Sequence, residues 1–284
     1  MTEMNLSYYP GCSLHSTGIE YNASVKSVFQ ALDVGLQELE DWNCCGASSA
    51  HIVSHELSLA LPARNLAIAQ KTGADVVMPC AACFNRHKSA EFILRSDGEQ
   101  RAYLEKTVGF TYTGSVRVRA LLDVIVNQIG LEPIKTRVRR PLAGLKAVSY
   151  YGCLLVRPPE VTQFENPDNP VLMDRLLEAL GCEARPWSYA TECCGGGLSL
   201  TKSKVAAKLV ARLAERAAEA GAQVIVTSCP LCQVNLEMRQ GGVKMPVFYF
   251  TELIGLAFGL DDAPVWLSKH LINPVPSLKS LFLL

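Results

Sequence analysis

The sequence has no excess of charge of either sign. Its 284 residues include 27 basic and 27 acidic side chains, and each half of the chain is neutral by itself. A nucleic-acid-binding protein needs a net basic face, so this balance argues against that class. The longest apolar runs fall well short of the roughly 20 residues that span a bilayer, so no membrane span is expected.

Targeting and nucleotide-binding signals are also missing. Residues 1–7 have neither the basic stretch nor the apolar stretch of a secretory signal, and we therefore expect a cytoplasmic protein. The three glycines at 195–197 lack the GxGxxG form and any P-loop lysine, so they do not predict a nucleotide loop. The cysteine run of ordinary ferredoxins, C-x2-C-x2-C-x3-C-P, is absent too, which argues against a common cubane cluster.

Apolar residues and cysteines are what the chain has in quantity. It is 49% hydrophobic and 19% charged, which is typical of a well-buried globular protein. The length allows one large domain or two of ordinary size. Eleven cysteines are present, an odd number in a chain that nothing marks for export. In a reducing compartment such thiols more often hold metal or perform redox chemistry than form disulfides.

Ten of the eleven cysteines follow one pattern twice. Each half has a lone cysteine after a glycine, then Cys-Cys-Gly, then Cys-x-x-Cys, and thirty-five positions separate the last two motifs in both halves. The first set is Cys12, Cys44, Cys45, Cys80 and Cys83, and the second is Cys153, Cys193, Cys194, Cys229 and Cys232. Cys182 stands outside the pattern, and we expect a small buried hydrophobic residue there. The sequence thus predicts a duplicated unit of about 145 residues.

Hydrophobic patterns place these cysteines at equivalent points of an α/β fold. Short strands that end at Gly-Cys are predicted at 6–9 and 147–150, and strands that lead into CxxC at 75–78 and 223–226. Helices are predicted at 21–32, 58–72, 171–180 and 202–220. Each half is therefore expected to form a small, mainly parallel sheet flanked by helices. Such sheets bind ligands beyond the carboxyl ends of their strands.

Domain boundaries follow from the repeat. We expect a first domain at 1–132, a linker at 133–145 and a second domain at 146–260. The linker carries four basic residues, which is typical of a solvated segment, although a site that attracts an anionic substrate or partner stays open. The tail at 261–284 ends in an apolar sequence, and we expect it to dock on a partner subunit.

Five cysteines per half limit what the chain can hold there. Zinc takes four ligands in a tetrahedron, so five cysteines, two of them adjacent, fit structural zinc poorly. Disulfides would leave one thiol per half unpaired, and inert buried cysteines would not recur at a fixed spacing. Iron–sulfur clusters are held by cysteine thiolates at many spacings, so we favour them. The fifth thiolate indicates an unusual cluster.

The doubled pattern resembles the B subunit of heterodisulfide reductase, a family built from two cysteine-rich CCG domains. The family order of lone Cys, Cys-Cys-Gly and CxxC is present in both copies here, between Cys12 and Cys232. The sequences at 9–15 (YPGCSLH) and 43–51 (NCCGASSAH) are similar to the bacterial branch of the family. The sequence RPPE at 157–160 is similar to the family's second domain.

The resemblance implies two non-cubane 4Fe-4S clusters, one per domain, each held by the five cysteines of its own half. It implies that a low-molecular-weight or protein disulfide is reduced between the clusters, or thiols are oxidised in reverse, with one electron from each cluster. The chain has no flavin, nicotinamide or ferredoxin motif, so it is expected to receive electrons from partners. The family's partners are a ferredoxin-type C subunit together with a flavin-containing A subunit.

Proton transfer and a second function stay open. His15 follows Cys12 by three residues and His51 follows Cys45 by six, so either is a candidate to pass protons near the first cluster. A hydrogen-bonding or surface role is the competing interpretation. CCG domains also occur in iron–sulfur subunits of complexes that oxidise 2-hydroxyacids or glycerol 3-phosphate, where the subunit only transfers electrons. Those chains typically carry a fused ferredoxin segment, which is absent here.

Overall fold

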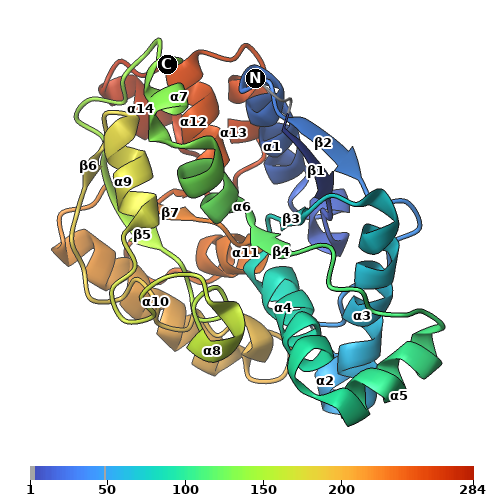
Figure 1. The fold of residues 1–284 in the computed structure, drawn as a ribbon. Helices are drawn as coiled ribbons and strands as arrows, with labels where there is room; N and C mark the ends of the chain where they lie inside the picture. The colour runs from blue at the N-terminus through green and yellow to red at the C-terminus, as the bar shows by residue number, and fades with distance from the viewer. Residues whose placement is uncertain (1–3, 48) are drawn as a thin grey trace.

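Two four-stranded parallel sheets organise the chain in the computed structural model (Figure 1). The structure describes residues 4–47 and 49–284, so the first three residues and Ser48 lie outside it. The strand orders, β2-β1-β3-β4 and β6-β5-β7-β8, are equivalent, which confirms the duplicated α/β unit. The strands are β1 (Asn5–Tyr8), β2 (Gly35–Glu38), β3 (Val76–Met78), β4 (Val118–Ala120), β5 (Lys146–Tyr150), β6 (Glu183–Ala184), β7 (Val224–Thr227) and β8 (Val247–Tyr249).

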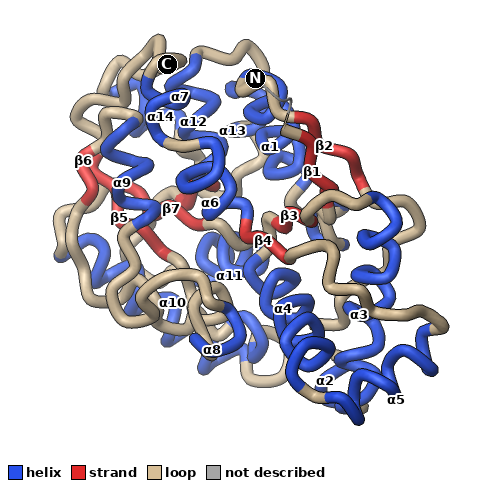
Figure 2. The backbone as a smooth tube through the Cα atoms, viewed as in Figure 1, coloured by secondary structure: helices blue, strands red, loops and turns tan. Residues whose placement is uncertain are grey.

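Equivalent helices follow equivalent strands in the two halves. In the first half these are α1 (Ile19–Ala31), α3 (His55–Thr72), α4 (Ala81–Ser96) and α6 (Leu121–Asp123), which continues as a π-helix, η2 (Val124–Ile129). In the second half they are α9 (Leu172–Ala179), α10 (Ser203–Glu219), α11 (Pro230–Arg239) and α12 (Phe250–Phe258). Figure 2 shows the strands as two short bands with helices on their flanks. No helix of the described residues has both the length and the apolar character needed to span a membrane.

Shorter elements distinguish the halves and complete the chain. They are η1 (Cys12–His15), α2 (Ala50–Val53), α5 (Gly98–Val108), α7 (Leu131–Lys135), α8 (Pro159–Thr162), η3 (Gly196–Leu198), α13 (Ala263–Leu267) and α14 (Val275–Ser280). The predicted strands and helices are confirmed with small shifts at their ends. The largest shift is at α3, which begins at His55 because the Ser54 hydroxyl accepts a hydrogen bond from the Leu57 backbone N at 3.2 Å and caps the helix.

The central strands are apolar because helices cover both faces of each sheet. Every residue of β3 and of β7 is buried. Each strand leads directly into a CxxC motif, whose first cysteine is the N-cap of the next helix, Cys80 for α4 and Cys229 for α11. The fold therefore places both CxxC motifs at the carboxyl ends of central strands.

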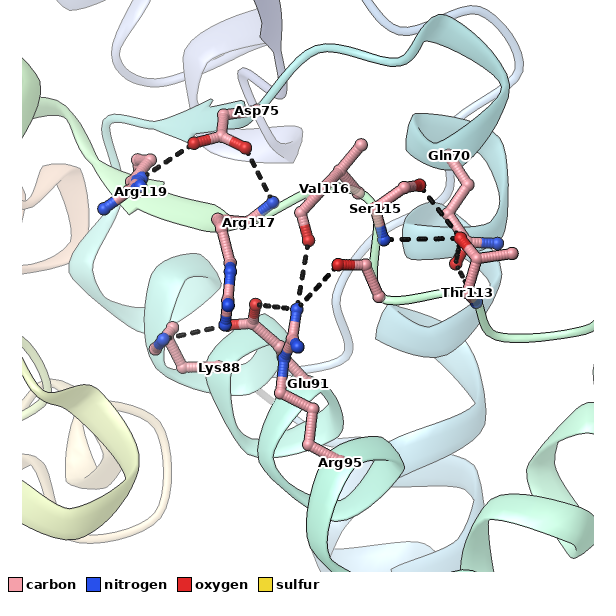
Figure 3. Close-up of polar contacts among 11 residues, drawn as sticks. Gln70, Asp75, Lys88, Glu91, Arg95, Thr113, Ser115, Val116, Arg117 and Arg119 are labelled. Atoms are coloured by element: carbon pink, nitrogen blue, oxygen red, sulfur yellow. Dashed lines mark hydrogen bonds and ion pairs between the residues drawn. The ribbon is translucent and has the colours of Figure 1, made fainter.

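A polar network fixes the outer part of the first sheet (Figure 3). Asp75 accepts a hydrogen bond from Arg119 Nε at 2.9 Å and another from the Arg117 backbone N at 2.8 Å, and these bonds join the start of β3 to β4. On the neighbouring helix α4, the buried Glu91 pairs with Lys88 Nζ at 2.8 Å. The two carboxylates thus pair with Arg119 and with Lys88 at this edge of the first domain.

The two domains pack through helices α1 and α12. Tyr21 on α1 stacks on Tyr249, with ring centroids 3.9 Å apart and an interplanar angle of 5°. One turn further, Ser24 Oγ and Thr251 Oγ1 lie 2.7 Å apart. All residues of α12 are buried, so this helix forms part of the core that both domains share.

The tail folds back on its own chain. Trp266 on α13 and Leu278 on α14 are buried, whereas Phe282 near the C-terminus is 94% exposed. Some of the apolar end is thus covered by the chain itself and some faces solvent. Docking of this tail on a partner subunit stays a prediction.

Candidate functional site

The ten repeated cysteines gather where the central strands end. Cys12 begins η1 after β1, and Cys153 follows β5 at the equivalent place. In the first half, Cys44 Sγ lies 3.7 Å from Cys12 Sγ, and Cys45 Sγ lies 3.3 Å from Cys83 Sγ. The loop that carries Cys-Cys-Gly thus meets both the lone cysteine and the CxxC motif.

The second half repeats this arrangement. Cys194 Sγ lies 3.6 Å from Cys232 Sγ, and the thiols of Cys193 and Cys153 are close enough to shift each other's pKa. The backbone N of Gly195 also donates to Cys193 Sγ at 3.2 Å. The structure therefore brings five thiols together in each half, as the spacing predicts.

The two sets of thiols also meet each other. The thiol of Cys80 lies near that of Cys229 of the other half, and this neighbour raises the pKa of Cys80. A cavity of about 70 Å³ lies beside this contact. It is lined by the five cysteines of the second set and by Ala81 and Ala82, which lie within the first CxxC motif. The cavity is thus an apolar space at the thiols of the second half, and the first CxxC motif forms part of its wall.

Hydrogen bonds within the thiol pairs separate their pKa values. The hydrogen bond with Cys12 lowers the pKa of Cys44 to about 2 and raises the pKa of Cys12. In the second half, the neighbouring thiol of Cys153 lowers the pKa of Cys193 to about 6, and the thiol of Cys193 raises the pKa of Cys153. Crowded thiols cannot all ionise without a compensating positive charge. This donor set therefore suits an iron-containing group, which would bind with loss of the remaining protons.

Glycines let the backbone pass very close to the sulfur atoms. Gly11 has φ +74, and a Cβ there would lie 2.9 Å from Cys83 Sγ. Gly152 has φ +67, and a Cβ there would lie 3.2 Å from Cys232 Sγ. Both positions precede the lone cysteine of their half, so the same close approach is built twice. The cradle formed by backbone and thiols is consistent with a cluster bound in each half.

Buried tyrosines support the loops that carry the cysteine pairs. The Tyr9 hydroxyl donates to the Asn43 carbonyl at 2.9 Å, and the Tyr150 hydroxyl donates to the Glu192 carbonyl at 2.7 Å. Asn43 and Glu192 directly precede the Cys-Cys pairs of the two halves. Sequence reasoning missed these tyrosines, although a tyrosine shortly before each Gly-Cys is the signal that could have found them.

A histidine that the sequence did not single out connects two motifs of the first half. The Asn65 amide donates to His87 Nε2 at 3.1 Å, which leaves His87 Nδ1 as the donor to the Cys83 carbonyl at 2.8 Å. Burial lowers the pKa of His87 to about 4, so the imidazole is neutral. Asn65 also donates to the Asn43 carbonyl at 2.9 Å, which ties the Cys-Cys loop to the CxxC helix.

The second half uses a different support. Asn235 Nδ2 donates to the Cys194 carbonyl at 2.6 Å, while Asn235 Oδ1 accepts from the Ser199 hydroxyl at 2.8 Å. The buried hydroxyl of Ser228, next to Cys229, has no hydrogen-bond partner among the described residues. A sulfur atom of a bound cluster would supply an acceptor for it. No three His, Cys, Asp or Glu side chains of residues 4–47 and 49–284 are arranged to hold a single metal ion.

The remaining predicted residues lie apart from the thiol contacts. His15 is half exposed, with Nε2 3.0 Å from Glu38 Oε1 and its ring edge-on to Trp42 at 5.2 Å. His51 is exposed on α2. Cys182 is only 6% exposed and packs in the hydrophobic core, and burial raises its pKa to about 12. The structure thus separates Cys182 from the two thiol groups, and the proton-transfer roles of both histidines stay predictions.

Comparison with known proteins identifies the repeat. The family model described as a cysteine-rich domain, CCG, matches residues 6–86 and 147–237. The chain is 31% identical to the 8-methylmenaquinol:fumarate reductase membrane anchor subunit of Wolinella succinogenes over 95% of this chain and 98% of that protein. It is 27% identical to the B subunit of the ferredoxin/F(420)H(2)-dependent CoB-CoM heterodisulfide reductase of Methanosarcina acetivorans, over 98% and 97%.

Further similarities agree with this result. A protein of Archaeoglobus profundus, named for its likeness to the heterodisulfide reductase B subunit, is 30% identical over 90% of this chain and 91% of its own length. The crystal structure of a hypothetical protein from Helicobacter pylori has the same fold, with a TM-score of 0.70 at 12% identity over 95% of this chain. Our chain spans about half of that protein, 52% of its length. With both CCG repeats matched and near-full-length similarity, the chain belongs to the family of heterodisulfide reductase B subunits.

Proposed function

We propose that this chain is the catalytic subunit of a heterodisulfide reductase-like complex and reduces a disulfide to two thiols, or oxidises thiols in reverse. The observation that supports this function best is the proximity of the two CxxC motifs, where the Cys80 and Cys229 thiols are neighbours and Ala81 and Ala82 of the first motif wall a cavity at the second set of cysteines. A disulfide bound there would contact the thiols of the second half and would lie against the first CxxC motif. The relatives named for heterodisulfide reductase support the same function.

The cysteines of each half would hold one non-cubane 4Fe-4S cluster. Reduction of one disulfide takes two electrons and two protons and yields two thiols. The clusters would supply the electrons, one from each half, which gives the duplicated unit a chemical purpose. The protein's own contribution is to hold the ten thiolates, to exclude water with buried apolar walls such as Ala81 and Ala82, and to deliver protons.

Protons would enter from the solvent side of the first half. His15 lies on the same short helix as Cys12, pairs with Glu38 at 3.0 Å and remains half exposed, so it can exchange protons with water. His51 is exposed on α2, which follows the Cys-Cys-Gly loop. Of the two, His15 has the partner that would orient its ring, and we therefore favour it.

The electrons would come from partner proteins. We propose a ferredoxin-type C subunit together with a flavin-containing A subunit, as the family resemblance implies. The exposed end of the tail, around Phe282, is the candidate surface for one of them. Copurification with a tagged chain tests this, with a truncation before residue 281 as the matched variant.

A second function is favoured by one relative. The Wolinella succinogenes protein is named as the membrane anchor subunit of an 8-methylmenaquinol:fumarate reductase, so its name refers to a quinol and fumarate and not to a disulfide. In this alternative the chain would only relay electrons between a membrane quinol and a partner. The same ten cysteines and two clusters would serve that role.

A substrate panel separates the two functions. The purified complex is incubated without oxygen with a low-potential dye and a set of neutral, anionic and cationic disulfides, and thiol formation is measured. The proposal predicts that at least one disulfide is reduced and yields two thiols per molecule. If the complex with its full iron content reduces none of the disulfides, but a soluble quinol reduces its clusters, electron transfer from a quinol is the correct function.

A further inference from the structure

One buried hydroxyl contacts both CxxC turns. Tyr21 lies on α1 and is fully buried. Its Oη is 3.3 Å from the carbonyl oxygen of Pro79 and 3.1 Å from that of Ser228. Pro79 and Ser228 directly precede Cys80 and Cys229, the first cysteines of the two CxxC motifs. A residue of the first domain is therefore hydrogen-bonded at equivalent points of both halves.

The hydroxyl has one hydrogen to share between two acceptors. A tyrosine O–H donates one hydrogen, so the two carbonyls either divide it in a three-centre bond or take it in turn. Burial raises the pKa of Tyr21, so the hydroxyl keeps its proton. In both arrangements the two carbonyl oxygens must stay within hydrogen-bond distance of one atom. That requirement limits how far the two turns can separate.

The ring of Tyr21 is held as firmly as its hydroxyl. It stacks on Tyr249 at 3.9 Å, and the Tyr249 backbone N is fixed in turn by the Glu252 carboxylate at 2.8 Å. One turn along α1, Ser24 Oγ forms a hydrogen bond with Thr251 Oγ1 on α12 at 2.7 Å. The position of the Tyr21 hydroxyl is thus set by packing between the domains and does not depend on the CxxC turns themselves.

The contact between Cys80 and Cys229 lies directly after the two carbonyls. Each carbonyl belongs to the peptide that leads into its cysteine, so a displacement of either turn moves the thiol that follows. We propose that Tyr21 is a positioning residue that fixes the distance between the two CxxC turns, and with it the distance between the two thiol groups. Its importance for turnover rests on the proposed function, because a disulfide must reach both groups at once.

The test compares two phenylalanine variants of the full chain, each purified with its iron bound. Tyr21→Phe keeps the stacked ring and removes the hydrogen bond to both turns. Tyr249→Phe is the matched control, because it removes a buried hydroxyl from the same stack whose partner is Gln233 Oε1 at 3.4 Å. The magnetic interaction between the two paramagnetic clusters is measured by electron paramagnetic resonance, together with iron content and kcat and KM for disulfide reduction.

We expect Tyr21→Phe to keep its iron and to show a changed magnetic interaction and a severalfold lower kcat, while Tyr249→Phe matches the wild type in all three. An unchanged magnetic interaction in an iron-loaded Tyr21→Phe protein would overturn the proposal. If the wild type reduces no disulfide, the proposed function fails, but the magnetic comparison still decides the positioning role.

A second measurement needs neither iron nor turnover. In the iron-free full chain, a stoichiometric thiol oxidant such as diamide takes two electrons and two protons from each pair of thiols that it joins, and the disulfide between Cys80 and Cys229 is followed among the products. Peptide mass mapping gives the rate at which this bond forms. The rate should fall severalfold in Tyr21→Phe and stay unchanged in Tyr249→Phe, whereas equal rates in all three proteins would contradict the proposal.

Discussion

Single residues decide whether the thiols can approach the backbone. Gly11 and Gly73 both have a left-handed backbone, with φ +74 and φ +71, so an alanine is strained at either position by about 1–2 kcal/mol. They differ in their surroundings, because a Cβ at Gly11 meets Cys83 Sγ at 2.9 Å and a Cβ at Gly73 meets nothing within 4 Å. This pair separates backbone strain from crowding at the site.

We predict that Gly11→Ala loses the iron of the first half, whereas Gly73→Ala keeps all of it. Backbone strain should lower the stability of both variants to a similar degree. Their thermal midpoints should therefore be similar, while their iron contents should differ. Gly152→Ala should mirror Gly11→Ala in the second half, because its Cβ would lie 3.2 Å from Cys232 Sγ. Iron analysis after anaerobic purification checks this, and full iron in Gly11→Ala would show that the sulfur there has room to move.

The grouping of the ten cysteines can be predicted from the sequence, whereas the residues that hold their loops in place cannot. The spacing of the ten cysteines is visible because it repeats, and a thiol has few roles other than ligation at such a density. Tyr9, Asn65 and His87 act through hydrogen bonds whose partners are distant in sequence, such as His87 with Asn65. Such contacts depend on how α3 packs against α4, and no local pattern specifies that packing.

At the level of helices, a buried ionic group joins the tail to the second domain. His270 has Nδ1 2.9 Å from Glu237 Oε1 on α11 and Nε2 3.0 Å from Glu252 Oε1 on α12. Burial opposes the charged imidazole, but the two carboxylates outweigh it and raise the pKa of His270 to about 10. Glu20 on α1 lies near the same group. The tail is therefore fixed to the helix that carries Cys232.

This group makes stability depend on pH in a defined direction. A histidine whose folded pKa is raised stabilises the protein fully below its unfolded pKa of about 6.5. That stabilisation decreases as pH rises and is lost above the folded pKa of about 10. His270→Gln leaves two buried carboxylates without their cation, which should cost about 3–5 kcal/mol near neutral pH.

We predict that the difference in unfolding free energy between wild type and His270→Gln shrinks steadily from pH 6.5 to pH 10. Denaturant titrations at several pH values in this window measure it. His55, which begins α3 and is exposed, supplies the matched control, because His55→Gln removes an imidazole outside this ionic group. A constant difference for His270→Gln would mean that the imidazole is not charged in the folded protein.

Elements were predicted where their pattern is strong and missed where it is weak. The central strands β3 and β7 are short, apolar and followed by cysteines, so the sequence marks them clearly. The edge strand β6 has only two residues, which is too short to show any alternation. Helix α12 is buried on all sides, so it lacks the polar face that reveals an amphipathic helix.

The whole molecule is a pair of similar domains whose thiol groups meet. Matching strand orders show that the duplication seen in the sequence is also a duplication of fold. The sequence did not predict how the domains pack. Tyr21 and Tyr249 stack on each other but are far apart in the sequence, and no local pattern indicates that their elements meet. That packing brings the Cys80 thiol close to the Cys229 thiol.

Two clusters per chain predict a definite composition. Anaerobically purified protein should contain about eight iron atoms and about eight acid-labile sulfides per chain. Elemental analysis and sulfide determination check both numbers. About two zinc atoms without iron would exclude both proposed functions, and four iron atoms would show that only one of the two thiol groups is used.

The central claim is that both halves act on one disulfide, and one set of variants tests it directly. Cys83→Ala and Cys232→Ala remove equivalent ligands from the two halves, and Cys182→Ala removes a buried cysteine outside both groups. Disulfide reduction by the purified complex is measured for each variant and for the Cys83 and Cys232 double variant. Each of the two single variants should lose activity by about two orders of magnitude or more.

The double variant should be no worse than either single variant, because groups that act as one unit are not additive. Cys182→Ala should keep full activity and full iron. If Cys83→Ala or Cys232→Ala retains substantial disulfide reduction while its cluster is demonstrably absent, one cluster suffices and the two-cluster account is wrong.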